Sequence, residues 1–173
     1  MAAPAPQSGP RIAIVGSGVV GLIIAQGLVA RGLTNVTVYE QASCVQENGA
    51  GVGFTRSAIN CMRLISPVVE DVLNSISNGS GMDDDEDDYL QWVDGYNGDE
   101  EELLVKLSVG KDGFQGCHRQ HLLMGLLDRL PAGTVEFGKR VESLYEDPET
   151  GLVTIGFGDG KSACADARKC PKE

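Results

Sequence analysis

A glycine-rich turn between an apolar strand and a helix constrains this chain more than any other feature of its sequence. The segment reads GSGVVG at 16–21 and follows the run RIAIV at 11–15. That run is apolar on both alternating faces after Arg11, as expected of a parallel strand covered on two sides. Residues 19–31 predict a helix capped by Gly32, and the segment VTVY at 36–39 predicts the next strand. The sequence therefore predicts a strand, helix, strand unit with a right-handed crossover.

Each glycine of the G-x-G-x-x-G pattern has its own physical function. Gly16 permits the tight turn, and Gly18 lets a pyrophosphate approach the backbone. Gly21 allows the helix to pack closely against the sheet. The helix begins at Val19, and the free N–H groups and dipole at its start stabilise phosphate charge. The pattern predicts a Rossmann-like α/β domain, a parallel sheet with helices, that binds FAD or NAD(P).

An acidic residue at the end of the second strand makes this pattern more specific. Glu40 follows Gly21 by 19 positions, where a carboxylate accepts hydrogen bonds from ribose hydroxyls. A carboxylate there would repel a ribose 2′-phosphate, so the site favours FAD or NAD over NADP. The alternative is a chance coincidence of a glycine-rich turn and a surface glutamate.

The negative charge of the chain is concentrated in one segment. The sequence has 14 Lys and Arg against 25 Asp and Glu, for a formal net charge of −11. Residues 82–102 hold eleven acidic residues and no Lys or Arg, so the remainder is neutral. We therefore expect no nucleic-acid partner and no anionic membrane partner. We expect a mobile acidic surface loop at about 74–102, where the spaced ligands and glycine of a calcium loop are missing.

The cysteines and the hydropathy of the chain indicate where in the cell the protein is expected. The five cysteines include no C-x-x-C pair, and no signal peptide precedes them, which predicts an intracellular, cytoplasmic protein. Residues 1–10 are expected to form a disordered lead-in. The run 12–30 could span a membrane on length alone. Its four glycines favour a strand, a turn and a close-packed helix instead.

The rest of the chain predicts a loop, two helices and a meander. In chain order these are a glycine-rich loop at 44–55, a helix at 56–65 before Pro67, an amphipathic helix at 118–130 ended by Pro131 and Gly133, and an antiparallel three-stranded meander at 141–146, 152–158 and 161–165. Trp92 and Tyr96 are expected to be packing aromatics.

Several segments in this order resemble the group A FAD-dependent aromatic-ring monooxygenases, especially their fungal salicylate-hydroxylase-like branch. The resemblance covers about residues 11–166. It rests on RIAIVGSGVVGLIIAQGLVARGL with TVYEQA, on GAGVGFTRSAI, on QWVDGYN, and on CHRQHLLMGLLDRLP followed by the strand VEF and the meander. The resemblance implies FAD as the cofactor, and a family reaction that hydroxylates an aromatic substrate with NAD(P)H and oxygen.

The resemblance also assigns site residues. It implies that Glu40 binds the adenosine ribose, that Gly49, Ala50 and Gly51 line the flavin side of the cleft, and that Arg119 reaches the FAD. A guanidinium suits a pyrophosphate because its donors bind in pairs, although a surface arginine at a helix start is the alternative. Gln41 departs from the family, in which many relatives have Arg.

The family pattern is incomplete in this sequence. Relatives continue with an Asp-Gly motif on a strand after the meander, then a Gly-Asp motif and a substrate domain, and none of these is present. The tail 167–173 is polar and contains Pro171, so it is a poor central strand. We expect a partial FAD-binding domain at 11–166, from a truncated product, whose first strand has an exposed apolar edge. The alternatives are a non-catalytic FAD-binding or interaction module and, less favoured, an NAD-dependent dehydrogenase domain.

Two other chemistries are disfavoured by the residues around Cys117. Cys117, His118 and His121 are close in sequence, but a closed zinc site needs a fourth ligand, and no second ligand cluster is apparent. A nucleophilic pairing of Cys117 with His118 is disfavoured because adjacent side chains point apart. We expect no metal and no catalytic residue in this chain.

Overall fold

A three-stranded parallel sheet forms the centre of the protein, seen here in a computed structural model that describes residues 9–45, 50–77, 88–96, 102–110 and 113–166. The strands β1 (Ile12–Val15), β2 (Val36–Tyr39) and β7 (Val135–Glu136) lie in the order β1-β2-β7. Helix α1 (Val19–Ala30) connects β1 to β2, which pair in parallel. The predicted strand, helix, strand unit is therefore confirmed.

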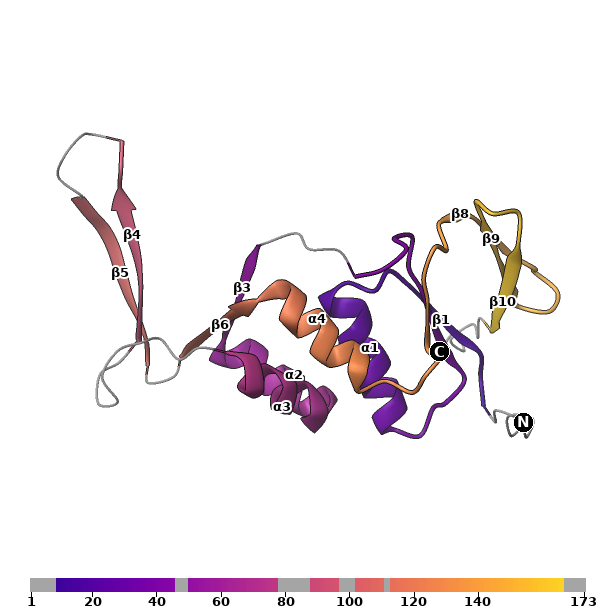
Figure 1. Cartoon of the computed structure of the whole chain (residues 1–173), viewed down its shortest axis with the longest axis horizontal. Coiled ribbons are helices and arrows are strands. Elements are labelled where there is room, and N and C mark those ends of the chain that lie inside the picture. The colour runs from indigo at the N-terminus through magenta and orange to yellow at the C-terminus, as the bar shows by residue number, and fades with distance from the viewer. Residues whose placement is uncertain (1–8, 46–49, 78–87, 97–101, 111–112, 167–173) are drawn as a thin grey trace.

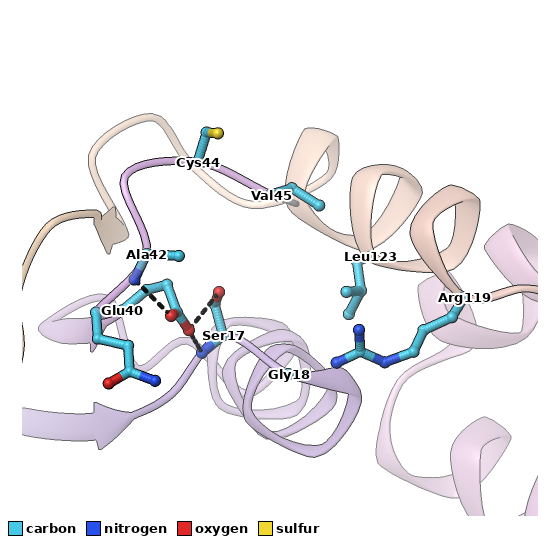
Figure 2. Close-up of a pocket in the computed structure, with 9 residues that line it drawn as sticks. Ser17, Gly18, Glu40, Ala42, Cys44, Val45, Arg119 and Leu123 are labelled. Carbon is cyan, nitrogen blue, oxygen red and sulfur yellow. Dashed lines mark hydrogen bonds between the residues drawn. The ribbon is translucent and has the colours of Figure 1, made fainter. Parts of the chain in front are cut away.

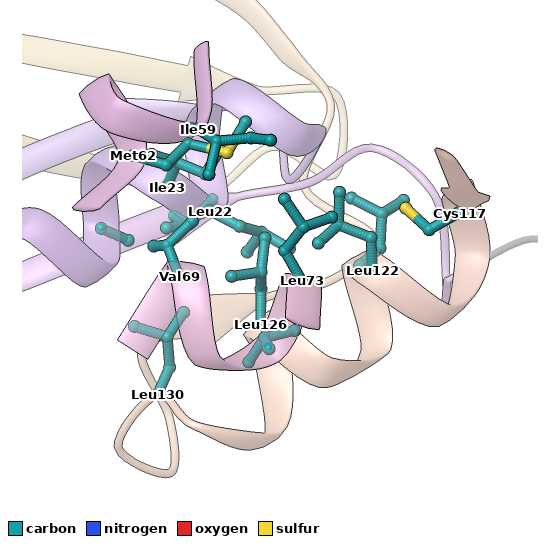
Figure 3. Close-up of a cluster of buried hydrophobic side chains, with 14 residues drawn as sticks. Leu22, Ile23, Ile59, Met62, Val69, Leu73, Cys117, Leu122, Leu126 and Leu130 are labelled. Atoms are coloured by element: carbon teal, nitrogen blue, oxygen red, sulfur yellow. The ribbon is translucent and has the colours of Figure 1, made fainter. Parts of the chain in front are cut away.

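Helices lie on one side of this sheet. Helix α1 contacts β1 and β2, and the helices α2 (Arg56–Ile65), α3 (Pro67–Ile76) and α4 (Arg119–Asp128) pack against α1 (Figure 1). Side chains on alternate strand positions point to opposite faces, and Val38 packs in the helical cluster. That cluster is built around Leu22 of α1, Leu73 of α3 and Leu122 of α4, each at most 1% exposed (Figure 3). Burial of these apolar surfaces is the main force that joins the helices to the sheet.

The predicted meander covers the opposite face. Strands β8 (Val141–Glu146), β9 (Leu152–Phe157) and β10 (Ser162–Asp166) pair antiparallel in the order β10-β9-β8. Phe157 packs on Tyr39 of the central sheet, with ring centroids 4.8 Å apart. The protein therefore has three layers: helices, parallel sheet and meander.

The expected glycine-rich loop at 44–55 is wrong for its last five residues. Gly51–Thr55 form strand β3, which pairs antiparallel with β6 (Phe114–His118). The Phe114 ring occupies the place of a side chain at Gly53, where a Cβ would overlap it. Gly53 is therefore needed for the pairing of β3 with a distant strand, which could not be predicted from local turn propensity.

The expected acidic loop at 74–102 is also wrong in part. Helix α3 continues to Ile76, and β4 (Asp88–Asp94) pairs with β5 (Glu102–Gly110) in a two-stranded ribbon that projects from the body (Figure 1). Apolar residues face each other across the ribbon, including Trp92 opposite Val105, and such cross-strand pairs stabilise strands despite flanking acids. Residues 78–87 and 97–101 lie outside the described residues.

Trp92 and Tyr96 are not packing aromatics, contrary to expectation. Trp92 on the ribbon is 51% exposed and Tyr96 is 94% exposed. The ribbon has only two strands, and in the described part of the chain no third strand pairs with it. Its apolar side chains therefore remain open to solvent.

The first strand lies at an edge of the sheet, as predicted. Among the described strands β1 pairs with β2 alone, and Val15 at its end is 59% exposed. Residues 1–8 of the expected lead-in and the tail 167–173 lie outside the described residues. No helix found in the described ranges is both long and apolar enough to cross a membrane.

Candidate functional site

The glycine-rich turn has the geometry that its sequence predicts. Gly16 has a φ of 95°, which favours glycine, and its N–H donates a 2.8 Å hydrogen bond to the Tyr39 carbonyl. A Cβ at Gly21 would overlap the Gly16 carbonyl oxygen, so only glycine permits this approach of helix to strand. A Cβ at Gly18 would meet no atom within 4 Å, so there is open space beside the turn.

Helix α1 begins at this open space with its amides uncapped. Gly18 is the N-cap residue and offers no side chain, and the first turn from Val19 contains no acidic residue. The first N–H groups of a helix have no partner within the helix, and they carry the positive end of its dipole. The start of α1 can therefore bind an anion.

Glu40 is held firmly at the end of β2. Its Oε2 accepts hydrogen bonds from the backbone N–H of Ser17 at 2.8 Å and from Ser17 Oγ at 3.0 Å (Figure 2). Its Oε1 accepts a 2.8 Å bond from the N–H of Ala42. Burial is the largest single influence on the pKa of Glu40 and raises it, but the hydrogen bonds from Ala42 and Ser17 together outweigh burial and lower it. Glu40 is therefore an ionised acceptor at neutral pH.

Arg119 reaches the same site from α4. It is the first residue of the helix, and its backbone N–H donates to the Ala50 carbonyl at 3.2 Å. Its side chain extends toward Gly18 (Figure 2). The guanidinium makes no salt bridge or side-chain hydrogen bond to any residue that the structure describes. Its donors are thus open to an anion that binds beside the turn.

One pocket brings these groups together. It has a volume of about 260 Å³ and is lined by Ser17, Gly18, Glu40, Gln41, Ala42, Cys44, Val45, Arg119 and Leu123. A second pocket of about 480 Å³ shares Gly18 and Arg119 with it, and a third of about 230 Å³ shares Glu40 and Gln41. The site is therefore elongated around the turn, with a carboxylate on one side of Gly18 and a guanidinium on the other.

Of the predicted flavin-side residues, the structure describes Ala50 and Gly51. Gly49 lies outside the described residues. Ala50 and Gly51 adjoin the start of α4, because Gly51 pairs with His118, but neither lines the pocket at Glu40. Their contact with a flavin stays a prediction.

Two groups at Glu40 were missed from the sequence. The Ser17 hydroxyl and the Ala42 amide complete the hydrogen bonds of Glu40. Ser17 could have been identified from the sequence, because it is the only residue of the turn GSGVVG with a polar side chain. The Ala42 amide carries no signal in the sequence.

The side chains of Cys117 and His118 point to opposite sides, as strand alternation predicts. Cys117 packs in the helical cluster, and burial raises the pKa of its thiol. His118 and His121 are exposed, with ring centroids 4.9 Å apart. Within the described ranges, no three His, Cys, Asp or Glu side chains gather where they could hold a metal ion.

Comparison with known proteins identifies the relatives of this chain. No protein-family model matches the sequence. A salicylate hydroxylase of Sarocladium schorii is 43% identical over 167 residues, which cover 94% of this chain and 35% of that protein. An FAD-dependent monooxygenase of a Phoma species is 39% identical over 92% of this chain and 37% of its own length. The chain is similar to a part of each of these fungal proteins. It spans about a third of the length of these FAD-dependent monooxygenases.

Solved structures of a salicylate hydroxylase and of an FAD-bound protein share the fold. A salicylate hydroxylase in a substrate complex matches with a TM-score of 0.71 and 25% identity, over 92% of this chain and 35% of that one. HpxO of Klebsiella pneumoniae, solved with FAD and uric acid, matches with a TM-score of 0.68 at 24% identity, over 93% of this chain and 38% of its own. The expected α/β architecture with its antiparallel meander is confirmed.

Proposed function

We propose that this chain binds FAD at the glycine-rich turn and forms the FAD-binding portion of a flavin-dependent monooxygenase. The observation that carries the proposal is the placement of Glu40 and Arg119 in one pocket on either side of Gly18. The ionised Glu40 accepts a hydrogen bond from a ribose hydroxyl, whereas Arg119 and the first amides of α1 bind the pyrophosphate. Together these groups fit the adenosine diphosphate part of FAD.

The reaction proposed for the complete enzyme follows from the relatives. One is named as a salicylate hydroxylase, and another as an FAD-dependent monooxygenase. In such a reaction an aromatic C–H becomes C–OH, one oxygen atom of O₂ enters the product, and the other leaves as water while NAD(P)H is oxidised. Bound FAD supplies the oxygen chemistry, and the residues of this chain bind and orient it. Gly49, Ala50 and Gly51 are proposed to face the flavin.

We also place the protein in the cytoplasm. Cys44, Cys61, Cys117 and Cys164 are free thiols, which supports a reducing compartment.

Titration of the purified chain with FAD and separately with NAD⁺ tests this proposal. We expect the fluorescence of FAD to change on binding until the site is saturated, and we expect NAD⁺ to bind more weakly than FAD. Glu40→Ala should weaken FAD binding, whereas Glu136→Ala, an exposed acid on the neighbouring strand β7, should not. A chain that binds no added FAD would overturn the proposal. With FAD bound, NADH-dependent oxygen uptake in the presence of an aromatic acid separates an enzyme from a binding module.

A further inference from the structure

Ser17 makes two hydrogen bonds to a single atom of Glu40. This residue stands between Gly16 and Gly18, and it is 9% exposed. We propose, on the basis of the FAD site proposed above, that Ser17 is a positioning residue that holds Glu40 so that Oε1 receives one ribose hydroxyl. Its role is thus to act on FAD through Glu40, without contact with the reacting atoms.

Ser17 occupies one of the two oxygens of the Glu40 carboxylate. A carboxylate has about four lone-pair sites. The Ser17 N–H and Oγ–H bind Oε2, and the Ala42 N–H binds Oε1. The backbone N–H of Gln41 also stabilises the ionised carboxyl. Oε2 is thus occupied by Ser17, and Glu40 lines the pocket that also holds Arg119, so Oε1 is the oxygen proposed to meet the ligand.

Holding the carboxylate beforehand reduces the cost of binding. A free glutamate side chain loses rotamer freedom when a ligand fixes it, and a preorganised group does not. The backbone N–H of residue 17 survives any substitution except proline, so Ser17→Ala removes the hydroxyl bond alone. The variant should hold Glu40 by backbone N–H groups alone.

Charged groups around Glu40 stay in place in this variant. Arg119 lines the same pocket as Glu40, and Lys139 lines the adjoining pocket. The Nζ atom of Lys139 forms an ion pair with Asp159 at 2.7 Å. Glu136 follows on the neighbouring strand, where its carbonyl accepts from the Glu40 N–H at 2.9 Å. A change in the pH dependence of FAD affinity in Ser17→Ala can therefore be attributed to the lost hydroxyl.

A double-mutant cycle on FAD affinity tests the proposal. Ser17→Ala should raise the Kd for FAD about three- to tenfold, and Ser17→Gly should do the same. In a Glu40→Ala background the Ser17 change should add nothing, because the residue on which it acts is gone. Equal effects in both backgrounds would show a structural role and overturn the proposal. Ser75→Ala in α3, whose hydroxyl donates to the Val72 carbonyl in its own helix, controls for the loss of a serine.

The pH profile gives a second, independent reading. The hydroxyl stabilises the ionised carboxylate, so its loss raises the pKa of Glu40. As pH falls, Ser17→Ala should therefore lose FAD affinity at a higher pH than the natural chain. Coincident profiles would contradict the proposal.

Carbon-13 NMR titration of the Glu40 carboxyl in the FAD-free chain separates this proposal from the proposed function. If FAD does not bind, the proposed function fails, and with it the role toward ribose. The titration still decides whether Ser17 holds Glu40. We expect the pKa of Glu40 to rise in Ser17→Ala, and an unchanged pKa would overturn that hold.

Discussion

The side-chain amide of Gln26 in α1 donates a 2.7 Å hydrogen bond to the Leu126 carbonyl near the end of α4. Gln26 is only 3% exposed. Carbonyls in the last turn of a helix lack partners within the helix, so this bond satisfies a buried group. It also joins the helix that begins at the glycine-rich turn to the helix that begins at Arg119.

Replacing Gln26 by leucine should destabilise the fold. The change keeps the volume similar but leaves the Leu126 carbonyl without its side-chain donor in the core, at a cost of about 1–3 kcal/mol. Urea unfolding followed by circular dichroism measures the loss. Gln91→Leu on the exposed ribbon is the matched control and should change the unfolding free energy by less than about 0.5 kcal/mol. Equal losses in the two variants would contradict a role for the buried bond.

Arg119 should contribute to FAD affinity as a paired donor. Arg119→Ala removes a charged hydrogen-bonding group, a loss of about 1.5–3 kcal/mol or roughly ten- to hundredfold in Kd. Arg119→Lys should recover only part of the affinity, because an ammonium lacks the paired donors. The same titration with Arg129→Ala, an exposed arginine at the other end of α4, should give the natural Kd. Full affinity in Arg119→Ala would remove this residue from the site.

Bound FAD should shield Cys44 from alkylation. Cys44 is exposed and lines the pocket with Glu40 and Arg119. Addition of FAD should slow its reaction with N-ethylmaleimide, followed by mass spectrometry of the modified peptides. Cys61 on α2 is exposed but does not line this pocket, and its rate should stay constant. Equal rates at Cys44 with and without saturating FAD would show that the ligand binds elsewhere.

Trp92 reports on the state of the ribbon. It is the only tryptophan in the sequence, and it is half exposed on β4. Its fluorescence should resemble that of an indole in water and be quenched readily by the neutral molecule acrylamide. Unfolding in urea should increase the quenching only slightly. A blue-shifted emission that resists acrylamide would show that the apolar face of the ribbon is covered.

Local chemistry explains which features the sequence could predict. Gly16, Gly21 and Glu40 have functions that depend on a few neighbouring residues and on fixed spacing, so the turn and the end of β2 are as predicted. The pairing of Gly53 with a strand more than sixty residues later depends on the ring of Phe114, which no local pattern contains.

Exposure and hydrogen bonding were harder to predict than the elements. Trp92 was expected to pack, but the local sequence does not say whether another layer covers it, and it is 51% exposed. Likewise, spacing indicated that Glu40 lies near a ribose without showing which donors hold its oxygens. The bond from Ser17 depends on the three-dimensional course of the turn.

Competition of ADP and of FMN with FAD tests the proposed mode of binding most directly. Glu40, Arg119 and the start of α1 recognise the adenosine diphosphate half of the ligand in this proposal. ADP should therefore displace FAD from the chain competitively, and FMN at the same concentration should leave FAD bound, as measured by flavin fluorescence. Displacement by FMN with no effect of ADP would contradict recognition through the adenosine diphosphate half.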